Sequence, residues 1–187
     1  MAEVVLFHHA QGLTPGVVSL ADALRAAGHV VHTPDLYDGA RFDDLDAGVA
    51  HAREIGLDTV LERGVAATSS LPDDVVYAGL SLGVLPAQQL AQTRPGARGA
   101  ILLHGTFPPG EFGDWPAGLP LQIHTMADDE WGDVDVARAL VAAVDGAELF
   151  LYPGDGHLFT DDSLPAHDED AAALVRQRVL AFLDRVR

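Results

Sequence analysis

Short apolar runs alternate with longer amphipathic stretches along the whole chain. The apolar runs are rich in Val, Leu and Ile and are nearly continuous, which is typical of strands covered on both faces by helices. A sheet of that kind is parallel, because its crossover helices occupy both faces. The predicted strands are residues 4–7, 29–33, 75–80, 100–104, 121–125 and 148–152.

Start and stop signals delimit the helices between these runs. Thr14 followed by Pro15 predicts a capped helix start, and Gly28 predicts the end of that helix. Residues 44–69 have a helical period interrupted by glycines, so two helices are predicted there, with Asp58 capping the second. Further helices are predicted at residues 83–93, 134–144 and 168–186. In the last one, an apolar side is expected to be formed by Leu174, Val175, Phe182 and Leu183.

The order of these elements predicts an α/β fold with a mainly parallel open sheet of about six strands and helices on both faces. The chain has 187 residues, which suits one domain of residues 1–187, and no composition shift marks a linker or a separate cap domain. Two Gly/Pro-rich stretches, residues 34–43 and 105–120, follow predicted strands. Loops in that position often build binding sites at the carboxyl edge of a parallel sheet.

Charge narrows the possible partners. The net charge is −17, and all 11 basic residues are Arg. An acidic chain of this kind is not expected to bind nucleic acid or an anionic membrane, since both require a basic surface. The chain has no Cys, so disulfides and thiolate chemistry are excluded. No signal peptide or membrane-spanning run is found, and a cytoplasmic location is expected.

One pentapeptide carries the first chemical signal. Gly79-Leu80-Ser81-Leu82-Gly83 follows a predicted strand and opens a predicted helix. In that context G-x-S-x-G predicts a nucleophile elbow, in which small glycines allow a sharp turn that lifts the serine above the sheet. A buried turn serine is the alternative. A hydroxyl nucleophile needs a base, and His157 lies in the loop after the last predicted strand, where it can reach the same edge.

An acid is needed to orient that imidazole, and two candidates, Asp128 and Asp129, lie just beyond the preceding strand. The resulting chain order of Ser, Asp and His is the one expected for an α/β-hydrolase. From spacing alone either carboxylate could serve, and the other is expected to be a solvated turn residue.

These motifs together resemble the dienelactone hydrolase family nearly from end to end. Similar segments are PDLY at residues 34–37, the elbow itself, YPGDGHLF around His157, and the stretch from His167 through the last helix. In the family's histidine loop the base falls on His157. In its acid motif, G-x-x-D, the aspartate falls on Asp129, with Met126 at the usual glycine; the resemblance therefore favours Asp129 over Asp128.

The resemblance also indicates an oxyanion hole and a binding pocket. The elbow rule gives the backbone N–H of Leu82 as one donor, and the similarity of FHHAQG to the family's loop after its first strand gives Ala10 as the other. The expected pocket residues are His9, Gln11, His104 and Arg41. The best-known family members use Cys as nucleophile and bind an anionic lactone through Arg, whereas this chain has Ser81 and a strongly acidic composition. A neutral or weakly charged ester is therefore favoured.

Other polar residues are assigned simpler roles. His8, His9, His104 and His124 lack ligand spacing, so no metal and no cofactor are expected. Trp115 and Trp131 are expected to line an apolar pocket, to pack in the core or to anchor a loop. The Asp clusters at residues 43–46 and 161–162 are predicted to be helix caps and solvated faces.

The sequence thus predicts a serine hydrolase that cleaves a small carboxylic ester or lactone through an acyl-enzyme on Ser81. Transfer of the acyl group to an alcohol would use the same intermediate. The alternative is a hydrolase-like domain that binds a small ligand or a partner without turnover, which Met126 and the doubled Asp keep open.

Overall fold

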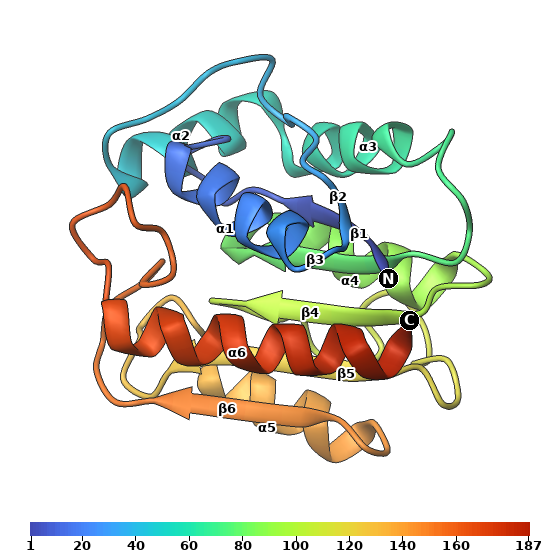
Figure 1. Cartoon of the computed structure of the whole chain (residues 1–187). Coiled ribbons are helices and arrows are strands. Elements are labelled where there is room, and N and C mark those ends of the chain that lie inside the picture. Colours follow the sequence, from blue (N-terminus) through green and yellow to red (C-terminus); the bar gives the residue numbers. More distant parts are fainter.

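Six parallel strands form one sheet in the computed structural model, which describes all residues 1–187 (Figure 1). The strands are β1 (Glu3–Phe7), β2 (Val30–His32), β3 (Val76–Leu80), β4 (Gly99–Leu103), β5 (Leu121–Met126) and β6 (Glu148–Tyr152). Their spatial order is β2-β1-β3-β4-β5-β6, and every neighbouring pair is parallel. The predicted α/β open sheet is therefore confirmed, with strand boundaries shifted by at most one residue.

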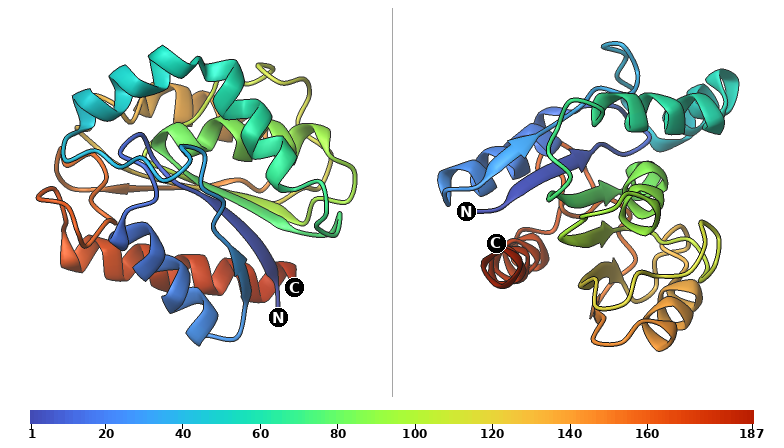
Figure 2. Two further views of the ribbon diagram at one scale, coloured as in Figure 1. Left: turned by 90° about the horizontal axis from the view of Figure 1, so that it is seen from above. Right: turned by 90° about the vertical axis from the view of Figure 1, so that its right-hand side faces the viewer.

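Helices cover both faces of this sheet (Figure 2). They are α1 (Pro15–Ala26), α2 (Leu45–Ile55), α3 (Leu57–Ala67), α4 (Val84–Thr93), α5 (Val134–Ala143) and α6 (Glu169–Val186). A short 3₁₀ turn, Ser81–Gly83, joins β3 to α4. Helices α1 and α6 pack on one face, while α2 to α5 pack on the other. None of the helices is both long and apolar enough to cross a bilayer.

Side-chain alternation along the strands gives the sheet a core on each side. In β1, Val4 and Leu6 pack beneath α1 and α6, whereas Val5 and Phe7 pack beneath the helices of the opposite face. All four side chains are at most 1% exposed. Because both faces are covered, the strands are apolar at nearly every position, which explains the continuous runs seen in the sequence.

Two local predictions were wrong. Asp58 does not cap α3: Gly56, with φ of +88°, ends α2 and directly begins α3, so Asp58 lies in the first turn. Its carboxylate still stabilises the helix there, because it interacts favourably with the positive end of the helix dipole. Leu174 does not belong to the buried side of α6, since it is 44% exposed while Val175 is fully buried. The buried stripe follows a spacing of three and four residues through Val175, Val179, Phe182 and Leu183, and Leu174 falls beside it.

Candidate active site

Ser81 lies at the carboxyl edge of the sheet, in a strained turn between β3 and α4. Its φ is +49°, in the left-handed region that non-glycine residues rarely adopt. The flanking glycines are needed for this turn: a Cβ on Gly79 would lie 2.2 Å from the Gly83 carbonyl oxygen, and one on Gly83 would lie 2.3 Å from that of Phe7. The turn is thus pressed against the end of β1, and the Ser81 side chain remains partly exposed.

A hydrogen-bonded chain links Ser81 to the two loops predicted to carry its partners. The Ser81 hydroxyl lies 2.9 Å from Nε2 of His157, and Nδ1 of His157 lies 2.8 Å from Oδ2 of Asp129. If Nδ1–H donates to the carboxylate, Nε2 is free to accept the Ser81 proton. Asp129 is 5% exposed, whereas Asp128 is exposed and forms neither a hydrogen bond nor an ion pair with His157. The structure therefore brings together Ser81, His157 and Asp129, and leaves Asp128 outside.

The loop after β5 holds the Asp129 carboxylate in place. The backbone N–H of Trp131 donates to Oδ1 of Asp129 at 2.9 Å. Gly132 passes so close that a Cβ there would lie 2.3 Å from Oγ1 of Thr125 and 2.9 Å from Oδ2 of Asp129. The Trp131 ring is 51% exposed and lies 6.2 Å from the His157 ring, between centroids. Trp131 therefore flanks the histidine instead of packing in the core, whereas Trp115 is half-buried and donates to the Leu119 carbonyl.

Met126, which stands where the family prefers glycine, supports the histidine loop. Its side chain is 3% exposed, and its sulfur accepts a hydrogen bond from the Gly156 N–H at 3.1 Å. The departure from the family pattern therefore leaves the His157–Asp129 contact intact.

The predicted oxyanion donors lie on the ends of neighbouring strands. Phe7 of β1 is paired with Gly79 of β3, and each of Ala10 and Leu82 comes three residues after one of these two. Ala10 is 2% exposed, yet no acceptor in the protein pairs with its backbone N–H. An unpaired buried N–H is uncommon in folded proteins and calls for a partner from water or a ligand.

The four predicted pocket residues do not share one open surface. His9 and His104 are fully buried, and Gln11 is 4% exposed. Gln11 ties the first loop to the one after β2 by donating from its side-chain amide to the Phe42 carbonyl at 3.1 Å. Arg41, next to Phe42, is exposed and makes no ion pair.

His104 lies close to Ser81 and His157. Gly105 would bring a Cβ within 3.8 Å of the Ser81 Cα, and the His104 ring contacts that of His157 edge-on at 5.9 Å between centroids. Nε2 of His104 is 2.7 Å from Oγ1 of Thr160, while its Nδ1 has no partner in the protein. Burial, together with the nearby His157, lowers the pKa of His104 well below its usual value. His104 is thus a neutral neighbour of His157.

The prediction for the second Asp cluster was wrong for one member. Asp162 is exposed, as expected for a solvated face, but Asp161 is 1% exposed and lies 2.8 Å from Nε2 of His9. No periodicity signals this burial, because it arises from a loop folding back over the start of α1.

A concavity of about 500 Å³ is remote from Ser81. It is lined by residues 94–98, which precede β4, by residues 116–120, which precede β5, and by the end of α6. This is the amino edge of the sheet, opposite the edge that carries Ser81.

Buried neutral histidines are expected to make the fold sensitive to acid. Burial lowers the pKa of His124 to about 3 and that of His8 to about 4. Below about pH 6.5 the unfolded chain binds these protons and the folded chain does not, so stability is present above that pH and is lost as the pH falls toward the folded values. Each such histidine should lower the free energy of unfolding by about 1.4 kcal/mol per pH unit in this window.

Urea unfolding at pH 7.0 and pH 5.0 measures this loss. A His124→Gln variant lacks one of the titrating groups and should lose less stability between the two pH values than the wild type. An equal loss in both proteins would contradict the assignment to His124.

Comparison with known proteins places the whole chain in one family. The family model for the dienelactone hydrolase family matches residues 1–187. Among curated protein sequences, none matches this chain.

Three similar solved structures share at most 19% of their residues with this chain. A dienelactone hydrolase-like promiscuous phosphotriesterase, P91, from metagenomic libraries has a TM-score of 0.76 and 18% identity over 100% of this chain and 87% of its own. Dienelactone hydrolase from Anabaena variabilis has a TM-score of 0.71 and 19% identity, covering 99% and 87%. Est1E from Butyrivibrio proteoclasticus, solved with ferulic acid bound, has a TM-score of 0.69 and 17% identity, covering 100% and 89%.

At identities of 17–19% the structural likeness shows the α/β-hydrolase fold alone, and the match to the family model shows the family of the chain. The chain belongs to the dienelactone hydrolase family and is a hydrolase of the α/β-hydrolase fold.

Proposed function

We propose that the protein is a serine esterase that hydrolyses a small carboxylic ester or lactone through an acyl-enzyme on Ser81. The observation that carries this proposal is the continuous hydrogen-bonded chain from Ser81 through His157 to Asp129. A serine hydroxyl is a weak nucleophile by itself, and this arrangement supplies both a base and a group that orients it.

In the proposed reaction, Ser81 Oγ attacks the ester carbonyl carbon as its proton passes to Nε2 of His157. Asp129 stabilises the imidazolium that forms. The backbone N–H groups of Ala10 and Leu82 stabilise the negative charge on the carbonyl oxygen. His157 then protonates the leaving alkoxide, and an alcohol departs. Water repeats the sequence on the acyl-enzyme, so a carboxylic acid is released and Ser81 regains its proton.

No metal or cofactor is required for these steps. The substrate is proposed to be neutral or weakly charged, since the net charge of −17 repels anions. Arg41 offers one unpaired cation near the loop after β1. Phe42 supports that placement, as its backbone N–H donates to the Gln11 carbonyl at 3.0 Å.

Fluorophosphonate labelling tests the proposal directly. A fluorophosphonate should react once per chain, mass spectrometry of the digested protein should locate the label on Ser81, and labelling should abolish hydrolysis of p-nitrophenyl acetate or butyrate. A folded protein with no label and no turnover on these esters would contradict the proposal and favour a domain that binds without catalysis.

A further inference from the structure

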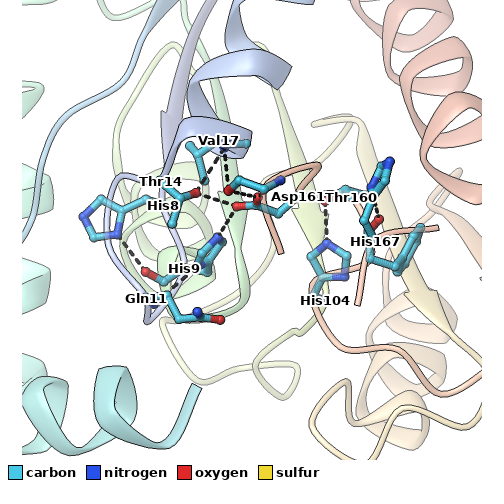
Figure 3. A network of polar contacts seen from close by, with 12 residues as sticks. His8, His9, Gln11, Thr14, Val17, His104, Thr160, Asp161 and His167 are labelled. Carbon is cyan, nitrogen blue, oxygen red and sulfur yellow. Dashed lines mark hydrogen bonds and ion pairs between the residues drawn. The ribbon is translucent and has the colours of Figure 1, made fainter. Parts of the chain in front are cut away.

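A second histidine–carboxylate pair, His9 and Asp161, joins two loops that are distant in the sequence (Figure 3). Nε2 of His9, in the loop after β1, is 2.8 Å from Oδ2 of Asp161, which follows His157 by four residues. Both side chains are fully buried, and 152 residues separate them along the chain. The pair is thus an internal link between the loop that carries Ala10 and the loop that carries His157.

Asp161 is held by donors on both of its oxygens. Oδ2 accepts from His9 and from the Thr14 hydroxyl, the latter at 2.5 Å. Oδ1 accepts from the backbone N–H and the hydroxyl of Ser163, at 2.9 Å and 2.6 Å. Burial raises the pKa of Asp161, but the hydrogen bonds from His9, Ser163 and Thr14 outweigh it and hold the pKa at about 2. The carboxylate is therefore ionised at every pH well above 2, which includes neutral pH.

The fold makes room for this carboxylate at the start of α1. A Cβ on Gly16 would lie 1.8 Å from Oδ1 of Asp161, so glycine is required at that position. The positive end of the helix dipole further stabilises a negative charge placed there.

The partners of His9 fix its tautomer. The backbone N–H of Gln11 donates to Nδ1 of His9 at 3.2 Å, so the ring proton resides on Nε2 and is donated to Asp161. Both ring nitrogens are therefore used within the protein and neither is free to exchange a proton with a substrate. In contrast to His157, His9 can act only through the position it gives to its neighbours.

Those neighbours are the groups on which the proposed reaction depends. Ala10, a proposed oxyanion donor, follows His9 directly. On the other side, the Asp161 N–H donates to the Leu158 carbonyl at 2.9 Å, which closes a tight turn after His157. Thr160, in the same turn, contacts His104 at the end of β4. Side chains of the histidine loop are thus hydrogen-bonded to residues that follow three strands. The pairs are His157 with Ser81 after β3, Thr160 with His104 after β4, and Asp161 with His9 after β1.

We propose that Asp161 is a positioning residue that, through His9, fixes the oxyanion loop (residues 8–12) relative to the histidine loop (residues 157–161). The inference rests on the proposed function for its catalytic consequence. An oxyanion donor and a base must hold their places to within about 0.5 Å, and a displacement of about 1 Å can cost roughly 100-fold in rate.

The variant Asp161→Asn tests this link with little change in shape. If the amide oxygen of the new side chain accepts the hydrogen bonds from Ser163, its NH₂ group faces the Nε2–H of His9, so two donors oppose each other. In the other His9 tautomer the proton lies on Nδ1, where it would oppose the Gln11 N–H instead. His9→Leu breaks the same link from the other side and leaves Asp161 with the Thr14 and Ser163 donors. Asp162→Asn is the matched control, because this exposed neighbour bonds only the Ser19 hydroxyl on α1 and loses the same charge.

We expect Asp161→Asn and His9→Leu to lower kcat for p-nitrophenyl butyrate by about 10- to 100-fold, with KM changed less than about threefold. Asp162→Asn should match the wild type. Thermal unfolding identifies folded samples, and kcat is expressed per folded protein. If Asp161→Asn and His9→Leu both fold and retain the wild-type kcat, or if their losses only follow the unfolded fraction, the proposal is overturned.

Two readouts do not depend on turnover. The ¹⁵N NMR shifts of the His9 ring should report a neutral Nε2–H tautomer in the wild type and a changed state in Asp161→Asn. Hydrogen exchange should accelerate in both loops together in Asp161→Asn and His9→Leu. Faster exchange in one loop alone would overturn the proposed link between the loops, whether or not the wild type hydrolyses esters. Inactivity of the wild type on esters would instead contradict the proposed function.

Discussion

Replacing Ser81 with alanine is expected to reduce kcat for a small ester by about 10⁴- to 10⁶-fold, leaving only the rate that oxyanion donors and binding can provide. The hydroxyl is the only group of the protein that forms a covalent bond to the substrate carbon in the proposed mechanism. Initial rates with p-nitrophenyl acetate at saturating substrate measure the loss, and the fluorophosphonate label should disappear from the same variant.

A Ser81→Gly variant separates this loss from unfolding. Ser81 has a φ of +49°, and glycine adopts that conformation without the cost of about 1 kcal/mol that other residues incur. The glycine variant should therefore be as inactive as the alanine variant but unfold at a higher urea concentration. Substantial turnover in either variant would show that another group attacks the ester.

The Asp129→Asn variant should lower kcat by about 10⁴-fold without unfolding the protein. Asn has nearly the shape of Asp, but its NH₂ group can face Nδ1 of His157, which favours the tautomer whose proton lies on Nε2. A protonated Nε2 cannot accept the Ser81 proton, so the base is lost although the geometry is kept. Single-turnover hydrolysis with excess enzyme measures the acylation step on which this effect should fall.

Asp128→Asn provides the matched control for this prediction. The two aspartates are adjacent and lose the same charge, but Asp128 is exposed while Asp129 lies 2.8 Å from the His157 ring. Asp128→Asn should retain kcat to within about twofold. The assignment of the acid would be wrong if the two variants lost activity to the same degree, or if Asp128→Asn lost more.

The regular elements were predictable because local sequence and tertiary packing favour the same structure. A strand buried on both faces must be apolar at nearly every position, and a side-chain acceptor stabilises a helix start, as Thr14 and Asp44 do for α1 and α2. A prediction was wrong where two local signals for a helix boundary competed. Gly56 ends one helix and begins the next, which leaves no place for Asp58 as a cap.

The proposed catalytic residues were also predictable, since each follows a strand of a parallel sheet. The carboxyl ends of such strands meet at one edge, so Ser81, Asp129 and His157 were expected to lie close together before any distance was known. Choosing between Asp128 and Asp129 needed more than that rule, because both follow β5. The resemblance to the dienelactone hydrolase family favoured the residue that the fold then brought to His157.

Patterns within a few residues were enough to predict the succession of strands and helices along the chain, their apolar faces and the sheet edge at which the proposed chemistry lies. Tertiary structure alone decided that Asp161 is buried against His9 rather than solvated like Asp162. A carboxylate can be buried only where donors from distant segments surround it, here from Thr14, His9 and Ser163, and no local pattern records which distant segments will meet.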